Sequence, residues 1–228
     1  PSDYICEGID QTRGWFYTLH AISVALFDKP AYKNLIVNEL VLDKNGQKMS
    51  KSKGNVVDPF YILDKYGADA TRWYLVTNSP PWRPTPFNEA DIEGTQKNFF
   101  RALINTYQFF AMYANIDGFT GEEPQIPIEK RPEIDRWIIS EMHALVKDYR
   151  ENMEGYDLTP AARGISDFTI DQLSNWYVRR NRRRFCKGEM SEDKLSAFQT
   201  LYECMLTICQ LMTPFAPFMA ELLYGKLN

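Results

Sequence analysis

The segment from Lys48 to Asn55, Lys-Met-Ser-Lys-Ser-Lys-Gly-Asn, concentrates three lysines, two hydroxyls and a glycine in eight residues. Flexible ammonium groups can hold a polyphosphate, with hydroxyls and backbone N–H groups as further donors. The segment is not a P-loop, because the G-x-x-x-x-G-K-[ST] spacing is absent. By composition alone a solvated basic turn is the commoner explanation, so the order of the residues has to decide.

A second polar stretch, Glu7 to Phe16, reads Glu-Gly-Ile-Asp-Gln-Thr-Arg-Gly-Trp-Phe. It lies where a strand is predicted to end and a helix to begin. In an open α/β sheet, ligands bind at the carboxyl ends of the strands, so carboxylates at this place can meet a ribose. The alternative is structural, with Asp10 acting only as a helix cap and Trp15 as a core residue.

A third stretch is strongly basic. Cations fill six of the nine positions from 179 to 187, namely Arg179, Arg180, Arg182, Arg183, Arg184 and Lys187. A helix of this composition, with aromatic residues beside it, can track a phosphate backbone. The alternative is a solvated face that Glu189, Glu192 and Asp193 neutralise, and the residues alone favour neither.

The elements that position the first two stretches follow from hydrophobic periodicity. A strand is predicted to end at Glu7 and to turn at Gly8, and helical spacing follows from Gln11 to Phe27. The residues from 35 to 42 are almost continuously apolar, as in a parallel strand that is covered on both faces. Strand, helix and strand in this order predict a βαβ unit. Short helices are predicted at 59–66, which Asp58 and Pro59 open, and at 68–76.

The remainder of the chain predicts helices alone. Pro-rich residues 79–86 exclude regular structure and mark a boundary, so we expect an α/β part at 1–80, a linker at 81–91 and helices at 92–228. Three apolar stripes at helical spacing predict an antiparallel bundle. The stripes are Phe99, Phe100, Leu103, Tyr107, Phe110 and Ala114; Ile134, Trp137, Ile138, Met142 and Leu145; and Leu195, Phe198, Tyr202, Met205, Cys209 and Met212.

Composition narrows the class of protein. The 228 residues are 44% hydrophobic and carry a net charge of −4, and no apolar run is long enough for a membrane span. The four cysteines form no C-x-x-C pair and there are two histidines, so we expect no metal site and no disulfide framework. Free thiols favour a cytoplasmic location. An opening at Pro1 and an end just after a helical pattern predict an excised piece of a longer chain.

The order Lys48-Met49-Ser50-Lys51-Ser52 resembles the lysine signature of the class I aminoacyl-tRNA synthetases. The segments 55–59 and 67–72 resemble the residues that come after that signature in the members that use branched aliphatic amino acids. The resemblance implies that Lys48 and Lys51 hold the phosphates of ATP, a substrate that binds with Mg²⁺, and that Ser50 and Ser52 belong to the same ATP site. Preorganised cations there stabilise the charge that moves onto the leaving pyrophosphate.

The stretch from Glu7 to Phe16 resembles the adenylate-binding motif of isoleucyl-tRNA synthetases, whereas valyl and leucyl relatives differ there. By this resemblance, the contacts to isoleucyl-adenylate come from Glu7, Gly8, Asp10 and Gln11, and Trp15 walls the pocket for the aliphatic side chain. A flat indole suits a β-branched side chain, which offers dispersion and desolvation for recognition. The resemblance implies isoleucine and ATP as substrates.

The basic helix and the segment 212–218 resemble the helical, anticodon-binding domain of the same family, which implies tRNA(Ile) as a partner. The expected fold class is therefore α/β and then all-α, the end of a Rossmann-like core followed by an antiparallel helical bundle. The family's other signature, His-x-Gly-His, is not in this chain, so we expect the chain alone to be inactive without the rest of the synthetase. A valyl-tRNA synthetase and a non-catalytic RNA-binding module that retains synthetase motifs remain as alternatives.

Overall fold

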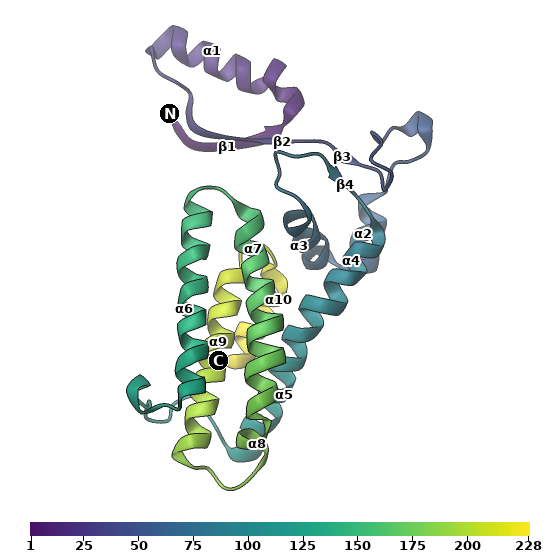
Figure 1. Ribbon diagram of the computed structural model, residues 1–228. Coiled ribbons are helices and arrows are strands. Elements are labelled where there is room, and N and C mark those ends of the chain that lie inside the picture. Colours follow the sequence, from purple (N-terminus) through teal and green to yellow (C-terminus); the bar gives the residue numbers. More distant parts are fainter. The chain divides into compact units, whose positions relative to one another are not determined.

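The computed structural model describes residues 1–228, and these form two compact units (Figure 1). Unit 1 consists of Pro1–Ile62 and Asn78–Glu89, and unit 2 of Leu63–Thr77 and Ala90–Asn228. The chain leaves unit 1 within helix α2 (Pro59–Tyr66) and returns at the end of helix α3 (Ala68–Asn78). The division of the chain at residues 80 and 92 stays a prediction about domains, since each compact unit combines two separate stretches.

Unit 1 begins with the βαβ arrangement that periodicity predicts. Strand β1 (Ser2–Gly8) pairs in parallel with β2 (Tyr32–Asn38), and Gly8 lies opposite Asn38 in the register. A 3₁₀ turn at Ile9–Arg13 follows β1 and leads into helix α1 (Trp15–Phe27). Because β1 and β2 are parallel, the turn after Gly8 and the chain after Asn38 leave the sheet at the same edge.

The continuous strand predicted at 35–42, buried on both faces, is wrong on two counts. The structure ends β2 at Asn38 and resumes with the two-residue strand β3 (Val41–Leu42). No residue of β2 is buried, because the sheet has only β1 as a neighbour. Helix α1 touches β2 near Tyr32, whose hydroxyl donates to the carbonyl of Phe16 at 3.4 Å. The apolar composition of this segment therefore predicted a strand correctly, but it did not predict how exposed β2 is in this chain.

The Pro-rich segment also contains a short strand that was not predicted. Strand β4 (Thr85–Pro86) pairs in parallel with β3. Two backbone hydrogen bonds hold the strands together. Thr85 N donates to Leu40 O at 3.0 Å, and Phe87 N donates to Leu42 O at 2.8 Å. Proline has no N–H to donate, so a strand containing Pro86 is restricted to this short edge pairing.

Unit 2 is built from α3 and a bundle of long helices, several of which run side by side in Figure 1. Two of its rods are continuous helices that contain a π-helical segment. The first comprises α4 (Glu89–Thr95), the π segment Gln96–Phe100 and α5 (Arg101–Asp117). The second comprises α7 (Leu158–Asp167), the π segment Phe168–Val178 and α8 (Arg179–Cys186). The other helices are α6 (Glu133–Glu154), α9 (Glu192–Met212) and α10 (Pro217–Leu227), with a 3₁₀ turn at Ile128–Lys130.

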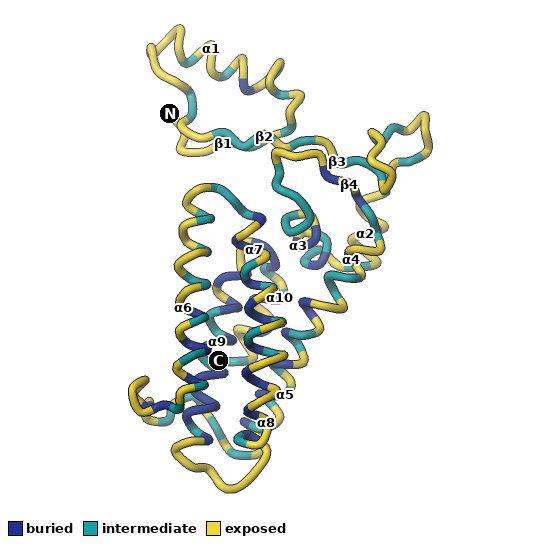
Figure 2. The backbone as a smooth tube through the Cα atoms, in the orientation of Figure 1, coloured by how far each residue is buried: buried dark blue, intermediate teal, exposed yellow.

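Buried residues run as dark blue along the helices of unit 2 in Figure 2. Most members of the first and third predicted stripes are buried, and helix α9 has its buried residues along most of its length. The second stripe buries Ile138 and Met142, and its other three members are partly exposed. Trp73 of α3 is 1% exposed and stacks on Phe99 with ring centroids 4.3 Å apart. Its indole N–H donates to Ser166 Oγ at 3.1 Å. Removal of such a buried aromatic ring costs about 3–5 kcal/mol, so these contacts fix the helices relative to one another.

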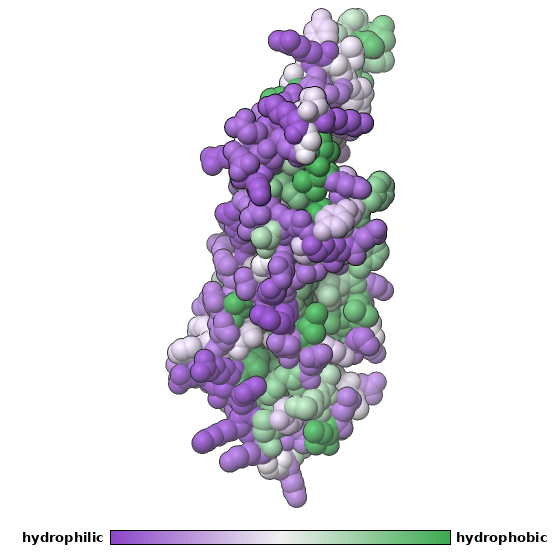
Figure 3. All heavy atoms as spheres, turned by 90° about the vertical axis from the view of Figure 1, so that its right-hand side faces the viewer, coloured by the Kyte–Doolittle hydropathy of each residue, from purple (hydrophilic) through white to green (hydrophobic).

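Unit 1 has a much smaller core. Its buried residues are Ile5, Phe16, Ile62, Thr85 and Phe87. Helix α1 exposes large apolar side chains, with Tyr17, Leu26 and Phe27 each about two-thirds accessible, at 66%, 69% and 68%. Hydrophobic atoms reach the surface at several places on the face of the molecule in Figure 3. No helix in the structure is both long enough and apolar enough to cross a bilayer.

Candidate functional site

The turn after β1 holds together the residues predicted to contact the adenylate. The side chain of Gln11 links Asp10 to Trp15. Its Nε2 donates to Asp10 Oδ2 at 2.8 Å, and its Oε1 accepts from Trp15 N at 3.0 Å. The start of α1 is therefore tied to the carboxylate of Asp10. Glu7 lies at the end of β1, and its side chain is exposed like that of Asp10. Trp15, whose backbone N–H bonds to Gln11, is 44% exposed and offers an apolar surface at the start of α1.

Two glycines leave room for this arrangement. A Cβ atom on Gly8 would lie 2.6 Å from Asp10 Oδ1, and a Cβ atom on Gly14 would lie 2.9 Å from Gln11 Oε1. Both distances are shorter than a carbon–oxygen contact permits, so any other residue would displace the polar group. The glycines of the motif are therefore explained by the close approach of the Asp10 and Gln11 side chains to the backbone.

The lysine-rich segment forms a compact loop after β3. A tight turn precedes it, in which Asp43 N donates to Gln47 O at 2.8 Å and Gly46 has a φ of 74°. Ser50 caps the 3₁₀ turn Lys51–Lys53 by accepting from Lys53 N at 3.3 Å. The hydroxyls of Ser50 and Ser52 are 3.2 Å apart. The loop therefore has a defined backbone without any contribution from a core.

The two lysines predicted to hold the ATP phosphates are free to bind an anion. Lys48 and Lys51 are exposed, and neither takes part in a salt bridge. They stand on either side of Met49 and Ser50, so their ammonium groups extend from neighbouring points of one loop. The hydroxyls of Ser50 and Ser52 are on the same loop. The structure thus brings the predicted ATP-site residues together on one short segment.

The basic stretch lies on α8 and at its end in unit 2. Five of its cations are exposed: Arg179, Arg180, Arg182, Arg183 and Lys187. The guanidinium of Arg180 lies over the ring of Trp176, 4.6 Å from its centroid, and that indole is 49% exposed. Arg182 lies over the ring of Phe109 at 5.9 Å. The exposed cations together with Trp176 form what we call the basic face.

Arg184 differs from the other cations because it belongs to a buried network. Its Nη1 and Nη2 atoms donate to the two carboxylate oxygens of Asp135 at 2.6 and 2.9 Å, and its Nη2 is 2.9 Å from Asp193 Oδ1. Asp135 is fully buried and also accepts from the hydroxyls of Tyr177 at 2.8 Å and Ser196 at 2.6 Å. The network joins α6, the rod of α7 and α8, and α9.

The protonation states in this network follow from its burial. Burial alone would lower the pKa of Arg184, but the hydrogen bonds and charge of Asp135 outweigh burial and raise it. Burial, and then the Asp135 carboxylate, raise the pKa of the Tyr177 hydroxyl, so this group remains a donor. The four hydrogen bonds that Asp135 accepts compensate for a buried charge, which is the arrangement that makes such a group tolerable.

The sequence assigned no role to Asp43 or Asp135, and it included Asn55 and Trp176 only as members of longer stretches. Asn55, the last residue of the lysine-rich segment, donates to Asp43, which precedes that segment, at 2.8 Å. An Asp two residues before an Asn and three before a Gly is a turn signal, which was available for Asp43. No sequence signal links Asp135 to Arg184, because 49 residues separate them.

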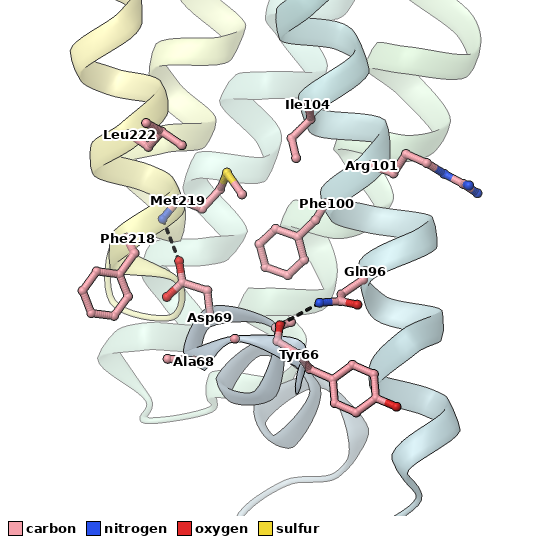
Figure 4. Close-up of a pocket in the computed structure, with 12 residues that line it drawn as sticks. Tyr66, Ala68, Asp69, Gln96, Phe100, Arg101, Ile104, Phe218, Met219 and Leu222 are labelled. Carbon is pink, nitrogen blue, oxygen red and sulfur yellow. Dashed lines mark hydrogen bonds between the residues drawn. The ribbon is translucent and has the colours of Figure 1, made fainter. Parts of the chain in front are cut away.

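A cavity of about 470 Å³ lies within unit 2 between α3, the α4–α5 rod and α10 (Figure 4). Its walls are mostly apolar, and they include Phe100, Phe218 and Leu222. Asp69 Oδ2 accepts from Met219 N at 2.6 Å, while its buried Oδ1 has no hydrogen-bond partner. The cavity has no pair of titratable groups suited to catalysis. No group of three or more His, Cys, Asp or Glu side chains in the structure is placed to hold a metal ion.

Two family models match parts of the chain. Residues 1–87 match the model of class I tRNA synthetases for isoleucine, leucine, methionine and valine, and residues 135–228 match the anticodon-binding domain of tRNA ligases. The whole chain is 57% identical over 228 residues to an isoleucine–tRNA ligase from Cytophaga hutchinsonii and 55% identical to one from Porphyromonas gingivalis. Each match covers 100% of this chain but 20% of the relative, so the chain spans about a fifth of the length of these relatives.

Solved structures resemble the fold. The methionyl-tRNA synthetase of Mycobacterium tuberculosis, bound by methionyl-adenylate, matches 98% of this chain and 43% of its own with a TM-score of 0.78 at 19% identity. A leucyl-tRNA synthetase of Agrobacterium radiobacter K84, in a complex with tRNA, matches 99% of this chain and 27% of its own with a TM-score of 0.72 at 20% identity. The predicted fold class, the end of a Rossmann-like core followed by a helical bundle, is confirmed. From its two family matches and its identity to these relatives over its full length, the chain belongs to the class I aminoacyl-tRNA synthetases.

Proposed function

We propose that the longer protein containing this chain is an isoleucine–tRNA ligase, in which unit 1 contributes to adenylate formation and unit 2 to tRNA binding. The observation that carries this proposal is an identity of 50–57% over essentially the whole chain to isoleucine–tRNA ligases of several bacteria. The class I model that matches residues 1–87 also includes valine-specific enzymes, so the choice of isoleucine rests on these relatives. The substrates are then isoleucine, ATP with its Mg²⁺, and tRNA(Ile).

The loop from Lys48 to Ser52 suits the first half of that reaction. A carboxylate oxygen of isoleucine attacks the α-phosphorus of ATP, a new acyl–phosphate bond forms, and the bond to pyrophosphate breaks. Negative charge moves onto the leaving pyrophosphate, where the unpaired ammonium groups of Lys48 and Lys51 stabilise it. The hydroxyls of Ser50 and Ser52 supply further hydrogen bonds to the phosphates. Because these cations are already in place before the reaction, they lower its free-energy barrier and do not need to move as the charge develops.

The turn after β1 suits the adenylate. The exposed carboxylates of Glu7 and Asp10 accept hydrogen bonds from hydroxyl or ammonium groups, and Gln11 keeps Asp10 in place. Gly8 lets this carboxylate approach the backbone. The open face of Trp15 packs against the aliphatic side chain of isoleucine, which is recognised by dispersion and loss of water.

The basic face suits the tRNA backbone. Arg179, Arg180, Arg182, Arg183 and Lys187 are exposed, and their ammonium and guanidinium groups are matched to phosphates. Arg184, which the sequence grouped with them, is held by Asp135 and Asp193, so we assign it to the support of this surface.

The four cysteines are free thiols, which favours a reducing compartment and hence the cytoplasm.

The role of Lys51 can be tested in the full-length enzyme. We expect Lys51→Ala to slow single-turnover adenylate formation by about 100-fold, as loss of one transition-state donor does. The affinity for isoleucine should hardly change, because the lysine does not contact the amino-acid side chain. Lys44→Ala removes the same charge from the exposed turn that precedes the loop, and serves as the matched control.

Two outcomes would contradict the proposal. An unchanged rate for Lys51→Ala, or an equal loss for Lys44→Ala, would show that the loop does not hold ATP through this side chain. If the full-length wild type shows no isoleucine-dependent exchange of pyrophosphate into ATP, the non-catalytic RNA-binding alternative takes its place.

A further inference from the structure

Two side chains join the ends of the lysine-rich loop. Asp43 follows β3, before the loop, and Asn55 is the last residue of the lysine-rich segment. Asn55 Nδ2 donates to Asp43 Oδ2 at 2.8 Å, so the backbone on both sides of the loop is held by this one contact. Neither residue is one of the lysines or serines that contact ATP in the proposed function.

We propose that Asp43 and Asn55 form a clamp that positions the lysine-rich loop for adenylate formation. The inference rests on the proposed function, since it assumes that the loop binds the phosphates of ATP. Both residues act through the loop backbone and not on the substrate, so they are positioning residues.

The side chain of Asn55 also hydrogen-bonds to the backbone of Lys48 and Ser50 within the loop. Its Nδ2 also donates to Lys48 O at 3.3 Å, and its Oδ1 accepts from Ser50 N at 2.9 Å. Both donors and the acceptor of this amide are thereby used within the loop. The backbone is fixed on both sides of Met49, which sets the point from which the Lys48 side chain extends.

Asp43 organises the turn before the loop. Its Oδ1 accepts from Asn45 N at 2.9 Å and from Gln47 N at 2.8 Å, while its Oδ2 accepts from Asn55. The hydrogen bond from Asn55, followed by that from Gln47, lowers the pKa of Asp43. A carboxylate at position 43 accepts at both oxygens. An amide at this position would place its own NH₂ group against either the NH₂ group of Asn55 or the backbone N–H groups of Asn45 and Gln47.

The hydrogen bonds continue from Ser50 to the second lysine. Ser50 Oγ accepts from Lys53 N at 3.3 Å, which closes the 3₁₀ turn that carries Lys51. Gly54, with a φ of 65°, then turns the chain back to Asn55. Lysine side chains lose much rotamer freedom on binding a phosphate, so a fixed backbone leaves only the side chain to be ordered.

The first test removes the Asn55 amide from the full-length enzyme. We expect Asn55→Ala to reduce kcat for adenylate formation by about 10- to 100-fold, because a small displacement of catalytic groups has effects of this size. The KM for isoleucine should stay the same, since the turn after β1 is intact. Asn45→Ala is the matched control, because Asn45 contributes only its backbone N–H to Asp43. Equal activities of Asn55→Ala and Asn45→Ala would overturn the clamp.

The second test exchanges the two residues. Asn55→Asp alone places two carboxylates against each other, and Asp43→Asn alone places two amides against each other. The double variant restores a donor facing an acceptor and keeps an acceptor for Ser50 N, although it loses the bond to Lys48 O. We expect its kcat to exceed that of either single variant by about tenfold, because only the double variant restores the hydrogen bond that joins the two ends of the loop. A double variant no better than the single ones would contradict the proposal.

Lys51→Ala in the same assay separates the clamp from the proposed function. If Lys51→Ala loses activity and Asn55→Ala does not, the clamp alone is wrong. If Lys51→Ala keeps full activity, the proposed function of the loop is wrong, and the clamp with it. Thermal unfolding of each variant accompanies the kinetics, and a fall in kcat that merely follows loss of folded protein counts against the clamp.

Discussion

The two units hold their functional residues in different ways. In unit 1, hydrogen bonds join residues that are close in sequence: Gln11 bonds to Asp10 and to Trp15, and Asp43 bonds to Asn55. In unit 2, the residue that supports the basic face, Arg184, depends on Asp135, which is 49 positions away and completely buried. Local hydrogen bonds define the first kind of site and a packed core defines the second.

This difference determines how each site responds to change. A contact between exposed neighbours contributes little to stability, and its loss alters geometry without unfolding the chain. A buried charge that loses its partner destabilises the whole unit, because the remaining group keeps its desolvation cost. We therefore expect variants in unit 1 to affect the reaction and variants under the basic face to affect folding first.

The largest expected effect comes from Asp135→Ala. This change removes four hydrogen bonds and leaves Arg184, whose side chain is 17% exposed, without its main partner. The free energy of unfolding should fall by about 3–5 kcal/mol, as is typical of broken buried ion pairs. Denaturant unfolding followed by far-UV circular dichroism measures it.

Lys147→Ala provides the control for Asp135→Ala. Its Nζ lies 3.9 Å from Glu151 Oε1 in an exposed pair on the same helix, α6, so its loss should cost less than about 1 kcal/mol. Similar losses in the two variants would mean that burial does not distinguish the supports of unit 2 from its surface.

The next effect tests the basic face itself. Replacing Arg182 and Arg183 with glutamine in the full-length enzyme should weaken tRNA binding and lower the slope of log affinity against log salt by roughly 1–2 units. Adenylate formation should be unchanged, because these arginines belong to unit 2. Arg136→Gln with Arg150→Gln removes two exposed charges from α6 and serves as the control. An unaltered slope together with a lower melting temperature would instead indicate a structural role.

A smaller effect is expected at Trp176. Arg180 lies over its ring and the residue is 49% exposed, so we expect an unpaired base of the tRNA to stack on the ring. Trp176→Ala should weaken tRNA binding by about 1 kcal/mol, the lower end for a base stacked on an aromatic ring. Trp176→Phe should recover most of that loss, and the salt slope should stay constant in both. Tyr224→Ala on α10, with a similarly exposed ring, is the control. Equal affinities of the alanine variant and the wild type would exclude stacking.

The smallest effect is a titration in unit 1. The hydrogen bonds from Asn55 and Gln47 lower the pKa of Asp43, so its carboxylate stays ionised below the ordinary range of aspartate. The hydrogen bonds of Asp43 therefore persist as the pH falls towards that range and are lost only as it falls through the lowered pKa. Carbon-detected NMR titration of Asp43 should show this, and Asn55→Ala should raise the pKa while Asn45→Ala leaves it. No response to Asn55→Ala would contradict the assigned cause.

The sequence predicted the elements better than their surroundings. Periodicity located α1 and the helices of the bundle, and Asp58 with Pro59 marked the start of α2, where Asp58 Oδ1 accepts from Phe60 N at 2.9 Å. These features depend on neighbours in the chain. The exposure of β2 and the short strand β4 depend on pairing with distant segments, which periodicity does not report.

The same limit applies to the candidate sites. The lysine-rich segment and the turn after β1 were found because their residues are contiguous, and their specific roles stay predictions. The sequence from Arg179 to Lys187 does not show that Arg184 forms ion pairs while its neighbours are exposed, because its partners Asp135 and Asp193 lie on other helices. Type and spacing identify a cation, but only the fold shows whether it faces solvent or a buried carboxylate.

The π-helical segment Phe168–Val178 has a consequence for the orientation of the helix that follows it. An α-helix turns the chain by about 100° per residue, whereas the i→i+5 bonds of a π-helix turn it by less, so this segment sets the angular phase of everything after it. Rewinding the same residues as an α-helix would rotate α8 about its axis. Asn181 and Phe185 would then leave the core, and arginines of the basic face would turn towards it. The segment can therefore exchange one side chain for another at many positions, as long as its π-helical bonding is kept.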